Sequence, residues 1–351
     1  MSQKLRVAVL MGGPSSEREV SLRSAQMVLN YLDPTRYEPF AVDLNDLLGA
    51  PQAVADLARR ADFVFLALHG RFGEDGTVQG LLDAVGLPYQ GSGVAASALA
   101  MNKVRSKATY RDMGIPQARG LDFRVAPNGM WLRGISPLFG DRPLAPMTAA
   151  QVEQLVGEVL GFDVVLKGAT QGSTLGLAVV RTQAAFLPAL AETMVFDPEI
   201  LIEERLPGKE VTAGIIGDDE LTALPLIEIR PKAGDLFDYE AKYTAGASEE
   251  ICPAPIDAAL TEEIQRLSLA AHHALGCHGL SRSDFMIVDG KPYILETNTL
   301  PGLTENSLIP MAARAAGIML PELLDRLVGW GLAVRGRSKP ANGAGAHTAP
   351  R

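Results

Sequence analysis

Short hydrophobic runs alternate with helix-like repeats over the first hundred residues. LRVAVLMGG at 5–13 is typical of a buried strand that leads into a loop, and DFVFLALHG at 62–70 predicts another. Between them a helix is predicted, capped by Ser15 or Ser16, with an apolar face at Val20, Ala25, Val28 and Leu32. GTVQGLLDAVG at 76–86 predicts a short helix. Such alternation implies a parallel sheet with ligands at the carboxyl ends of its strands, where we find His69, Gly70 and residues 91–93.

The middle of the chain also mixes helical and extended patterns. Two helices are predicted, at 98–114 and 148–161, and two strands, at 162–168 and 199–206. Residues 121–148 contain four prolines and show no clear period. We interpret them as a loop-rich insertion with no assigned role.

The last third of the chain is typical of antiparallel strands with helices. Two strands are predicted around the Asp-Asp turn within 211–231, and a hairpin with an Asp-Gly turn is predicted over 282–298. Residues 237–250 are polar, aromatic and irregular, which indicates an exposed functional loop. Helices are predicted at 258–275, 307–317 and 320–332. From about residue 336 the composition predicts a disordered tail.

Composition narrows the class of protein. The chain has 351 residues, 47% of them hydrophobic, which suffices for two or three packed domains. A net charge of −9 argues against broad nucleic-acid binding, but not against a small anionic ligand held by a few lysines. No apolar run approaches the length of a membrane span, and the start lacks the features of a secretory signal. Two cysteines, Cys252 and Cys277, are too few for a disulfide framework, so we expect a cytoplasmic protein with free thiols.

The predicted hairpin concentrates polar groups. Glu296 and Asn298 stand two residues apart, so in a strand they point to the same side, and Asp284 on the neighbouring strand comes within reach. Three hard oxygen ligands fit Mg²⁺, which keeps substrate phosphates and water as further ligands. Arg282 shares the face of Asp284 and suits negative charge that grows in a transition state. A structural ion-pair cluster, or a strand that simply ends in polar residues, is the alternative.

A glycine-rich run follows the strand at 162–168. In VVLKGATQGSTLG at 164–176, backbone N–H groups and hydroxyls could wrap phosphate oxygens, with Lys167 supplying charge. The spacing is not that of GxxxxGK[ST]. Further candidates are Lys103 for phosphate, Glu203 for an adenine amino group and Glu210 for ribose hydroxyls. The plain alternatives are a glycine-rich hairpin loop, a solvated surface lysine and glutamates at a strand edge.

Other chemistries find little support in the sequence. The histidines at 272, 273 and 278 lack zinc-site spacing, and we interpret them as helix-surface and loop residues. No G-x-S-x-G motif occurs, and neither cysteine lies in a known nucleophile motif.

Taken in order, these segments resemble the D-alanine–D-alanine ligases, bacterial ATP-grasp enzymes that make the dipeptide of peptidoglycan. The resemblance runs from about residue 6 to 325. It rests on LMGGPSSEREVSLRSA, ALHGRFGEDGTVQGLLDAVGLPYQGSGVAASALAMNKVRSK, FDYEAKY, RSDFMIVDGKPYILETNTLPGLTENSLIPMAARAAG and, more loosely, VVLKGATQGSTLG.

The resemblance implies an α/β fold in parts. A Rossmann-like parallel-sheet domain at 1–100 would precede a two-part ATP-grasp fold, with a central lid domain at 101–203 and a C-terminal antiparallel domain at 204–335. The tail would be 336–351. The implied reaction uses ATP with two Mg²⁺ or Mn²⁺ ions to form an acyl phosphate on one D-alanine, which the amine of a second attacks. The implied partners are small molecules and a second copy of the chain in a homodimer, with neither nucleic acid nor membrane.

The resemblance also implies a role for each site residue. Around the first D-alanine it implies Glu17, His69, Ser173 and Tyr243. For ATP it implies Lys103, Lys167, Glu203, Glu210 and Lys242. For the metal ions it implies Asp284, Glu296 and Asn298. Arg282 and the Gly302 N–H would form the oxyanion hole, while Ser307 and the Leu308 N–H would take the carboxylate of the second substrate.

The sequence departs from the family pattern at three points, one of which is a 121–148 stretch that is longer than usual. Gly168 stands where relatives commonly have proline, and Arg205 where they often have an apolar or aromatic residue beside adenine. Relatives that use D-serine or D-lactate are alternatives, although Tyr243 favours an amine nucleophile. A non-catalytic ATP-binding protein is opposed by the complete set around Arg282, and a Rossmann dehydrogenase by the lack of G-x-G-x-x-G in GGPSSE.

Overall fold

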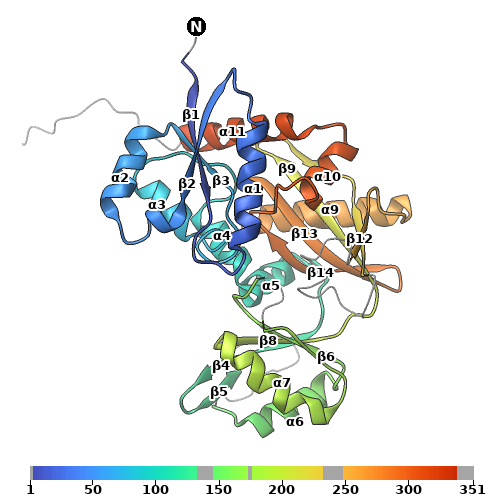
Figure 1. Ribbon diagram of the computed structural model, residues 1–351. Helices are drawn as coiled ribbons and strands as arrows, with labels where there is room; N and C mark the ends of the chain where they lie inside the picture. Colours follow the sequence, from blue (N-terminus) through green and yellow to red (C-terminus); the bar gives the residue numbers. More distant parts are fainter. Residues whose placement is uncertain (1–2, 133–144, 173–175, 232–247, 338–351) are drawn as a thin grey trace, which may run out of the picture.

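Three sheets and their helices make up the computed structural model, which describes residues 3–132, 145–172, 176–231 and 248–337 (Figure 1). The mixed α/β class predicted from the sequence is confirmed, with a parallel sheet first and antiparallel sheets after it. No helix in these residues is long and apolar enough to cross a membrane.

The first sheet is parallel, with strand order β2-β1-β3. Successive residues of its central strand, β1, face two different hydrophobic clusters. Val7 and Val9 face one cluster, and Ala8 and Leu10 face the other. Helices on both faces bury residues 7–10 of β1 completely, which explains the unbroken hydrophobic run there. The elements are β1 Leu5–Met11, α1 Arg18–Tyr31, β2 Tyr37–Asp43, the 3₁₀ turn Leu44–Asp46, α2 Pro51–Arg60, β3 Phe63–Leu66 and α3 Thr77–Ala84.

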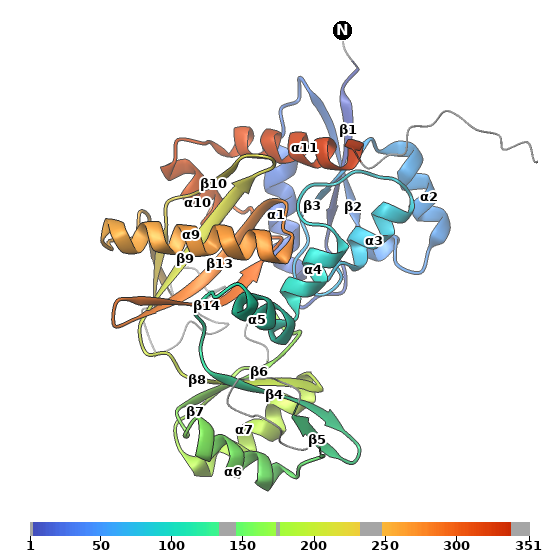
Figure 2. The ribbon, with the colours of Figure 1, turned by 180° about the vertical axis from the view of Figure 1, so that it is seen from behind.

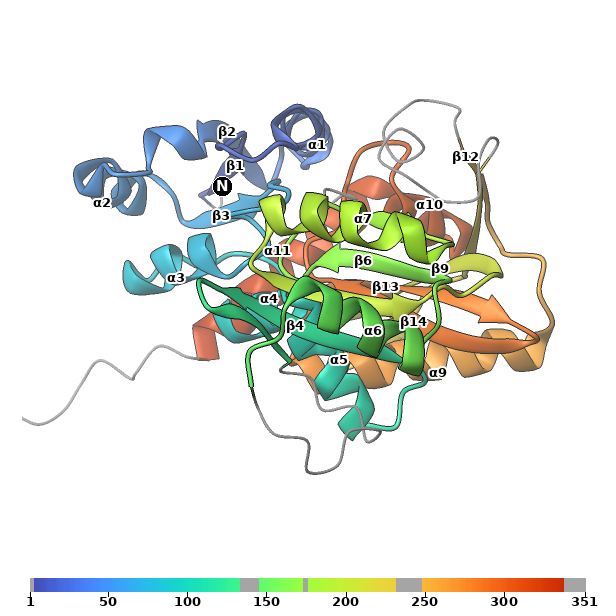
Figure 3. The same cartoon turned by 90° about the horizontal axis from the view of Figure 1, so that it is seen from below.

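The second sheet is antiparallel, with order β5-β4-β8-β6-β7, and helices α6 and α7 cover the face turned away from the rest of the molecule (Figures 1 and 3). Its elements are β4 Gly120–Ala126, β5 Gly129–Leu132, α6 Ala149–Val159, β6 Val164–Gly168, β7 Ala178–Val180, α7 Gln183–Phe196 and β8 Glu199–Glu204. The interpretation of 121–148 as loop-rich was wrong for its first part. Phe123 is buried in the core of this sheet, and β4 pairs with β8.

The third sheet has order β12-β11-β9-β13-β14, with β10 paired to β9. Helix α9 packs on it, as seen from behind in Figure 2. Its elements are β9 Lys209–Gly217, β10 Leu221–Ala223, β11 Ile227–Pro231, β12 Ser248–Ile251, α9 Ala258–Leu275, β13 Gly279–Val288 and β14 Lys291–Asn298. Two strands were predicted within 211–231, but the structure has three, β9, β10 and β11. The chain bends after β10, and β11 then pairs with the other end of β9.

The helix predicted over 98–114 is two helices, α4 Val94–Met101 and α5 Lys103–Asp112. Asn102 between them is extended, and its side chain accepts a hydrogen bond from the Arg105 N–H, which caps α5. Both helices contact α9 and β14. The domain boundaries expected from the sequence remain predictions, but α5 packs on the third sheet.

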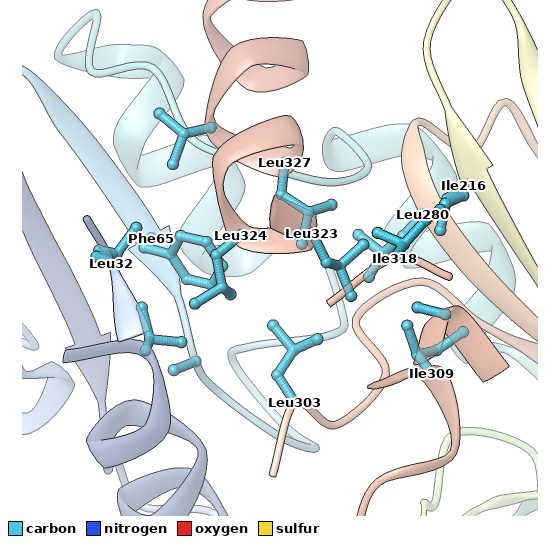
Figure 4. Packing of buried hydrophobic residues seen from close by; sticks show 14 of the residues in the cluster. Leu32, Phe65, Ile216, Leu280, Leu303, Ile309, Ile318, Leu323, Leu324 and Leu327 are labelled. Carbon is cyan, nitrogen blue, oxygen red and sulfur yellow. The ribbon is translucent and has the colours of Figure 1, made fainter. Parts of the chain in front are cut away.

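Helices α10 Leu308–Ala315 and α11 Leu320–Arg337 end the described chain. Helix α11 returns to the first sheet: Leu323, Leu324 and Leu327 join Leu32 and Phe65 in one buried cluster (Figure 4). The tail predicted from residue 336 therefore begins inside a helix, and residues 338–351 lie outside the described part of the chain.

His272 corrects another prediction, because its side chain is buried rather than on the helix surface. Its Nδ1 lies 2.7 Å from Ser281 Oγ. Burial, together with the charges of His273 and His278, lowers the pKa of His272 to about 4. The apolar spacing of α9 could not predict the burial of His272. The third sheet covers a wider face of the helix than the face that carries its hydrophobic residues.

Candidate active site

The β13–β14 hairpin brings four of the predicted site residues together. Arg282 is paired with Asn298, and Asp284 with Glu296, in the antiparallel register. The register shifts just after Asp284, where a β-bulge follows. All four side chains line a cavity of about 670 Å³. The predicted convergence of these residues is therefore present in the fold.

Asp284 is held by a short network at the cavity wall. Arg282 donates from Nε and Nη2 to its two carboxylate oxygens, both at 2.9 Å, and Thr212 Oγ1 donates to Oδ1 at 2.5 Å. Burial alone would lower the pKa of Arg282, but Asp284 outweighs this and raises it, so the guanidinium stays charged. Two donors fill the lone pairs of Oδ1, whereas the arginine occupies one on Oδ2.

The donor set of this hairpin suits a hard cation. Asn298 Oδ1 accepts one hydrogen bond, from the Leu300 N–H at 2.8 Å, and an amide oxygen has two lone pairs. Among the described residues, no group of three or more His, Cys, Asp and Glu side chains is arranged to hold a metal ion. Two carboxylates and one amide leave most positions to other oxygens, which fits Mg²⁺ bound through phosphates and water.

The charges that line the cavity also favour a divalent cation. Its described acidic lining residues are Glu17, Glu74, Glu210, Glu250, Asp284, Glu296 and Glu305. Its described lysines and arginines are Arg23, Lys103 and Arg282. Because acidic groups predominate, a polyphosphate needs divalent cations to bind beside them.

Lys103 joins the hairpin to the glycine-rich stretch. Its Nζ lies 3.0 Å from Glu296 Oε2 and donates to the Gln171 carbonyl at 2.8 Å. Its backbone N–H donates to the Ala169 carbonyl at 2.8 Å. The break at Asn102 makes this possible, because Lys103 stands at the first position of α5. Ser173 lies just beyond Gly172, outside the described residues, as do Lys242 and Tyr243.

A second phosphate candidate, Lys167, lies in β6 beside Glu203 in β8. Lys167 Nζ donates to Glu203 Oε2 at 3.0 Å, and Lys107 Nζ lies 2.6 Å from Glu203 Oε1. Sequence reasoning missed Lys107. The signal was available, because Lys103 and Lys107 are four residues apart on one helix and therefore share a face.

Glu17 and His69 approach the cavity from the first sheet. Glu17 is the N-cap residue of α1, but its side chain makes no capping bond; instead its N–H donates to Ser15 Oγ at 3.1 Å. The predicted serine cap of this helix was therefore wrong. A Cβ on Gly70 would lie 2.6 Å from Glu17 Oε2, so glycine permits this close approach. His69 Nε2 lies 3.0 Å from Ser24 Oγ.

Another part of the cavity wall is the turn that leads into α10. Ser307 Oγ accepts from the Thr304 N–H at 2.9 Å, and Leu308 begins the helix. A Cβ on Gly302 would lie 2.8 Å from Ser307 Oγ and 3.7 Å from His69 Cε1, so these three residues are close neighbours. The first N–H groups of a helix have no partner within it and suit an anion. The turn can thus receive a carboxylate in the cavity that Glu17 also lines.

Comparisons with known proteins agree with this geometry. The model of the D-ala D-ala ligase N-terminus matches residues 6–49 and 49–92, and the model of the C-terminus matches 143–329. The D-alanine–D-alanine ligase of Syntrophobacter fumaroxidans is 45% identical over 93% of this chain and 97% of its own. That of Pelotomaculum thermopropionicum is 42% identical over 92% and 96%.

Solved structures are similar over nearly the whole chain. D-alanine–D-alanine ligase from Bacillus anthracis, complexed with ATP, matches with a TM-score of 0.76 and 32% identity, over 95% of this chain and 100% of that one. VanG D-Ala:D-Ser ligase from Enterococcus faecalis matches with a TM-score of 0.75 and 27% identity, over 94% and 100%. With both domain models matched and such relatives over nine-tenths of its length, the chain belongs to the D-alanine–D-alanine ligase family.

Proposed function

We propose that this protein joins two D-alanines to D-alanyl-D-alanine at the expense of ATP. The observation that carries the proposal is the double contact of Lys103. Its ammonium touches Glu296 at 3.0 Å and the Gln171 carbonyl at 2.8 Å. The candidate metal hairpin and the candidate phosphate stretch therefore meet at one lysine, as phosphoryl transfer from a nucleotide requires.

The chemistry begins by activating a carboxylate. A carboxylate oxygen of the first D-alanine attacks the terminal phosphorus of ATP, which forms an acyl phosphate and releases ADP. The amine of the second D-alanine then attacks the acyl carbon, loses a proton, and the bond to phosphate breaks. Phosphate is the leaving group that a free carboxylate lacks. Water must be excluded, since it hydrolyses an acyl phosphate.

The two substrates would be held by different residues of the cavity wall. Glu17 would pair with the ammonium of the first D-alanine, with His69 beside it. Ser307 and the Leu308 N–H would take the carboxylate of the second. Arg282 and the Gly302 N–H would stabilise the oxyanion that forms between them. Ser173 and Tyr243 would complete the group around Glu17.

Nucleotide binding would use the lysines and the hairpin. Lys103, Lys167 and Lys242 would contact phosphates, and Glu203 and Glu210 would contact adenine and ribose. Asp284, Glu296 and Asn298 would hold two Mg²⁺ or Mn²⁺ ions, which neutralise the charge that develops on the phosphates. The excess of carboxylates around the cavity supports this requirement for cations.

A substrate panel tests the proposal. Phosphate release is measured with ATP and Mg²⁺, D-alanine as first substrate, and D-alanine, D-serine or D-lactate as second. We expect turnover only when D-alanine is the second substrate, and mass spectrometry identifies the dipeptide. Preference for D-serine would make the chain functionally similar to the VanG enzyme that it resembles in fold. Nucleotide-dependent stabilisation without any turnover would leave only an ATP-binding protein.

The remaining parts of the proposal concern the cell and the assembly. We propose a cytoplasmic enzyme, because ATP and the peptidoglycan precursor are found there. We also propose a homodimer, by analogy with the family. Sedimentation analysis of the purified chain measures the second point directly.

A further inference from the structure

A buried carboxylate shared by two lysines lies next to the candidate nucleotide site. Glu203 is 2% exposed and Lys107 is 4% exposed. One oxygen of Glu203 faces Lys107 at 2.6 Å, and the other accepts from Lys167 at 3.0 Å. The mechanism above uses Glu203 and Lys167 and leaves Lys107 without a task.

The triad carries two positive charges and one negative charge in a place with little water. Burial by itself would raise the pKa of Glu203, but the two lysines outweigh it and lower this pKa. Burial lowers the pKa of Lys107, opposed by Glu203 and assisted by repulsion from Lys167. Among these three groups one positive charge is left over, on which Glu296 and Glu210 act from outside the triad, and a phosphate oxygen can bind to it.

The three residues come from different parts of the fold. Lys107 is on α5, which packs against α9 and β14 of the third sheet, whereas Lys167 and Glu203 are on neighbouring strands of the second. Lys107 Nζ is also 3.4 Å from the Ile294 carbonyl in β14. Lys107 is thus anchored from the third sheet while it holds a carboxylate of the second.

We propose that Lys107 is a positioning residue for nucleotide binding, which keeps Glu203 charged and in place when Lys167 turns to the phosphates. The proposal rests on the proposed function, in which Lys167 contacts phosphate and Glu203 contacts adenine. Before ATP binds, each lysine neutralises one oxygen of Glu203. After ATP binds, Lys107 alone compensates the carboxylate, so Glu203 remains an acceptor for the adenine amino group.

The test compares Lys107→Met with Lys107→Arg, both by calorimetric binding of ATP and of adenosine. Met keeps the length of the side chain and removes its charge, whereas Arg keeps the charge. We expect Lys107→Met to weaken ATP binding about tenfold or more, because it leaves a buried carboxylate without its compensating charge. Adenosine has no phosphate to draw Lys167 away, so its binding should change far less. Lys107→Arg should restore most of the ATP affinity.

The pH dependence gives a second readout. In Lys107→Met, Glu203 must take up a proton when Lys167 leaves it, so ATP affinity should fall as pH rises, more steeply than in the wild type. The other charges that act on the triad, Glu296 and Glu210, are the same in both proteins. Equal pH profiles in the two proteins would overturn the proposal.

A double variant covers the case in which Lys107→Met fails to fold. Glu203→Gln with Lys107→Met contains no unpaired carboxylate, and it should bind ATP as well as Glu203→Gln alone. A further loss on adding Lys107→Met would mean that Lys107 acts through packing instead. If the wild type and Lys167→Met bind ATP equally, the assigned role of Lys167 fails. If Lys107→Met alone has no effect, only the present inference fails.

Discussion

Asp284 stands directly opposite Glu296 across the β13–β14 pair, while Arg282 grips the Asp284 carboxylate through two hydrogen bonds of 2.9 Å. The arginine therefore fixes the direction of one candidate metal ligand, and the strand register fixes the distance to the other. Substitutions in this hairpin separate metal binding from stabilisation of the transition state.

Asp284→Asn should strongly lower magnesium-dependent turnover. The amide lacks the charge of the carboxylate, and metal stabilisation of transferring phosphates is worth several kcal/mol, so we expect a loss of about 100-fold or more. Phosphate release at saturating ATP and D-alanine measures it. Asp289→Asn is the matched control, because Asp289 is exposed at the turn of the same hairpin, with a φ of 50° that asparagine tolerates. Full activity of Asp284→Asn would remove this residue from the metal site.

Arg282→Ala should lower kcat by about 10²–10³, as for loss of an oxyanion donor, and change ATP affinity much less. Its charge acts on the tetrahedral oxyanion, which exists only after the nucleotide has bound. Initial rates and equilibrium binding of ATP are measured on the same preparation. Arg326→Ala on the exposed side of α11 is the control. Normal kcat with a raised KM for ATP would show that the role of Arg282 is misassigned.

Gly331→Ala should destabilise the fold, whereas Gly329→Ala should not. A Cβ at 331 would lie 2.5 Å from the Tyr89 carbonyl oxygen and 2.9 Å from the Phe63 ring, while nothing lies within 4 Å at 329. Overpacking of this kind costs about 1–3 kcal/mol, and alanine at the open helix site gains up to about 1 kcal/mol. Urea unfolding of both variants measures the difference. Equal stabilities would mean that α11 does not dock as closely as described.

His272 should make the protein less stable as pH falls from 6.5 toward 4. The native pKa is lowered from 6.5 to about 4, so the unfolded chain binds more protons within this window. The contribution is complete above pH 6.5 and amounts to at most about 3 kcal/mol. Unfolding midpoints across this range are compared between the wild type and His272→Asn, whose slope should be shallower. His273→Asn, at an exposed neighbour, should keep most of the wild-type slope, because burial, the largest cause of the lowered pKa of His272, is unchanged.

The sequence predicted the parts of the fold that depend on local pattern. The β13–β14 hairpin was predictable because an Asp-Gly turn separates two alternating runs, and this fixed which carboxylates would face each other. The first sheet was predictable from its hydrophobic run. The parallel topology also predicted where the site lies. It is at the carboxyl end of β3, where His69 lines the cavity.

Features that depend on distant contacts were missed. The apolar spacing does not show the break at Asn102, because a polar residue at this position fits the pattern of one continuous helix. In the structure its side chain caps the start of a second helix, α5. Burial of His272 comes from the third sheet, on which α9 packs, and the carboxylate that pairs with Lys107 lies on a strand of the second sheet. A lysine looks solvated until the fold supplies a buried carboxylate.

The packing of α11 against β1 and β3 also bears on how the protein is made. Val7 and Val9 share their buried cluster with Leu323, Leu324 and Leu327, which the ribosome adds long after them. Ala25 and Val28 of α1 cover part of this face early, but β1 gains the rest of its apolar neighbours only after α11 has been made. A chain cut short before residue 320 would leave the part of this cluster that α11 covers exposed to water. Chaperones and proteases would then bind the apolar surface of the first sheet.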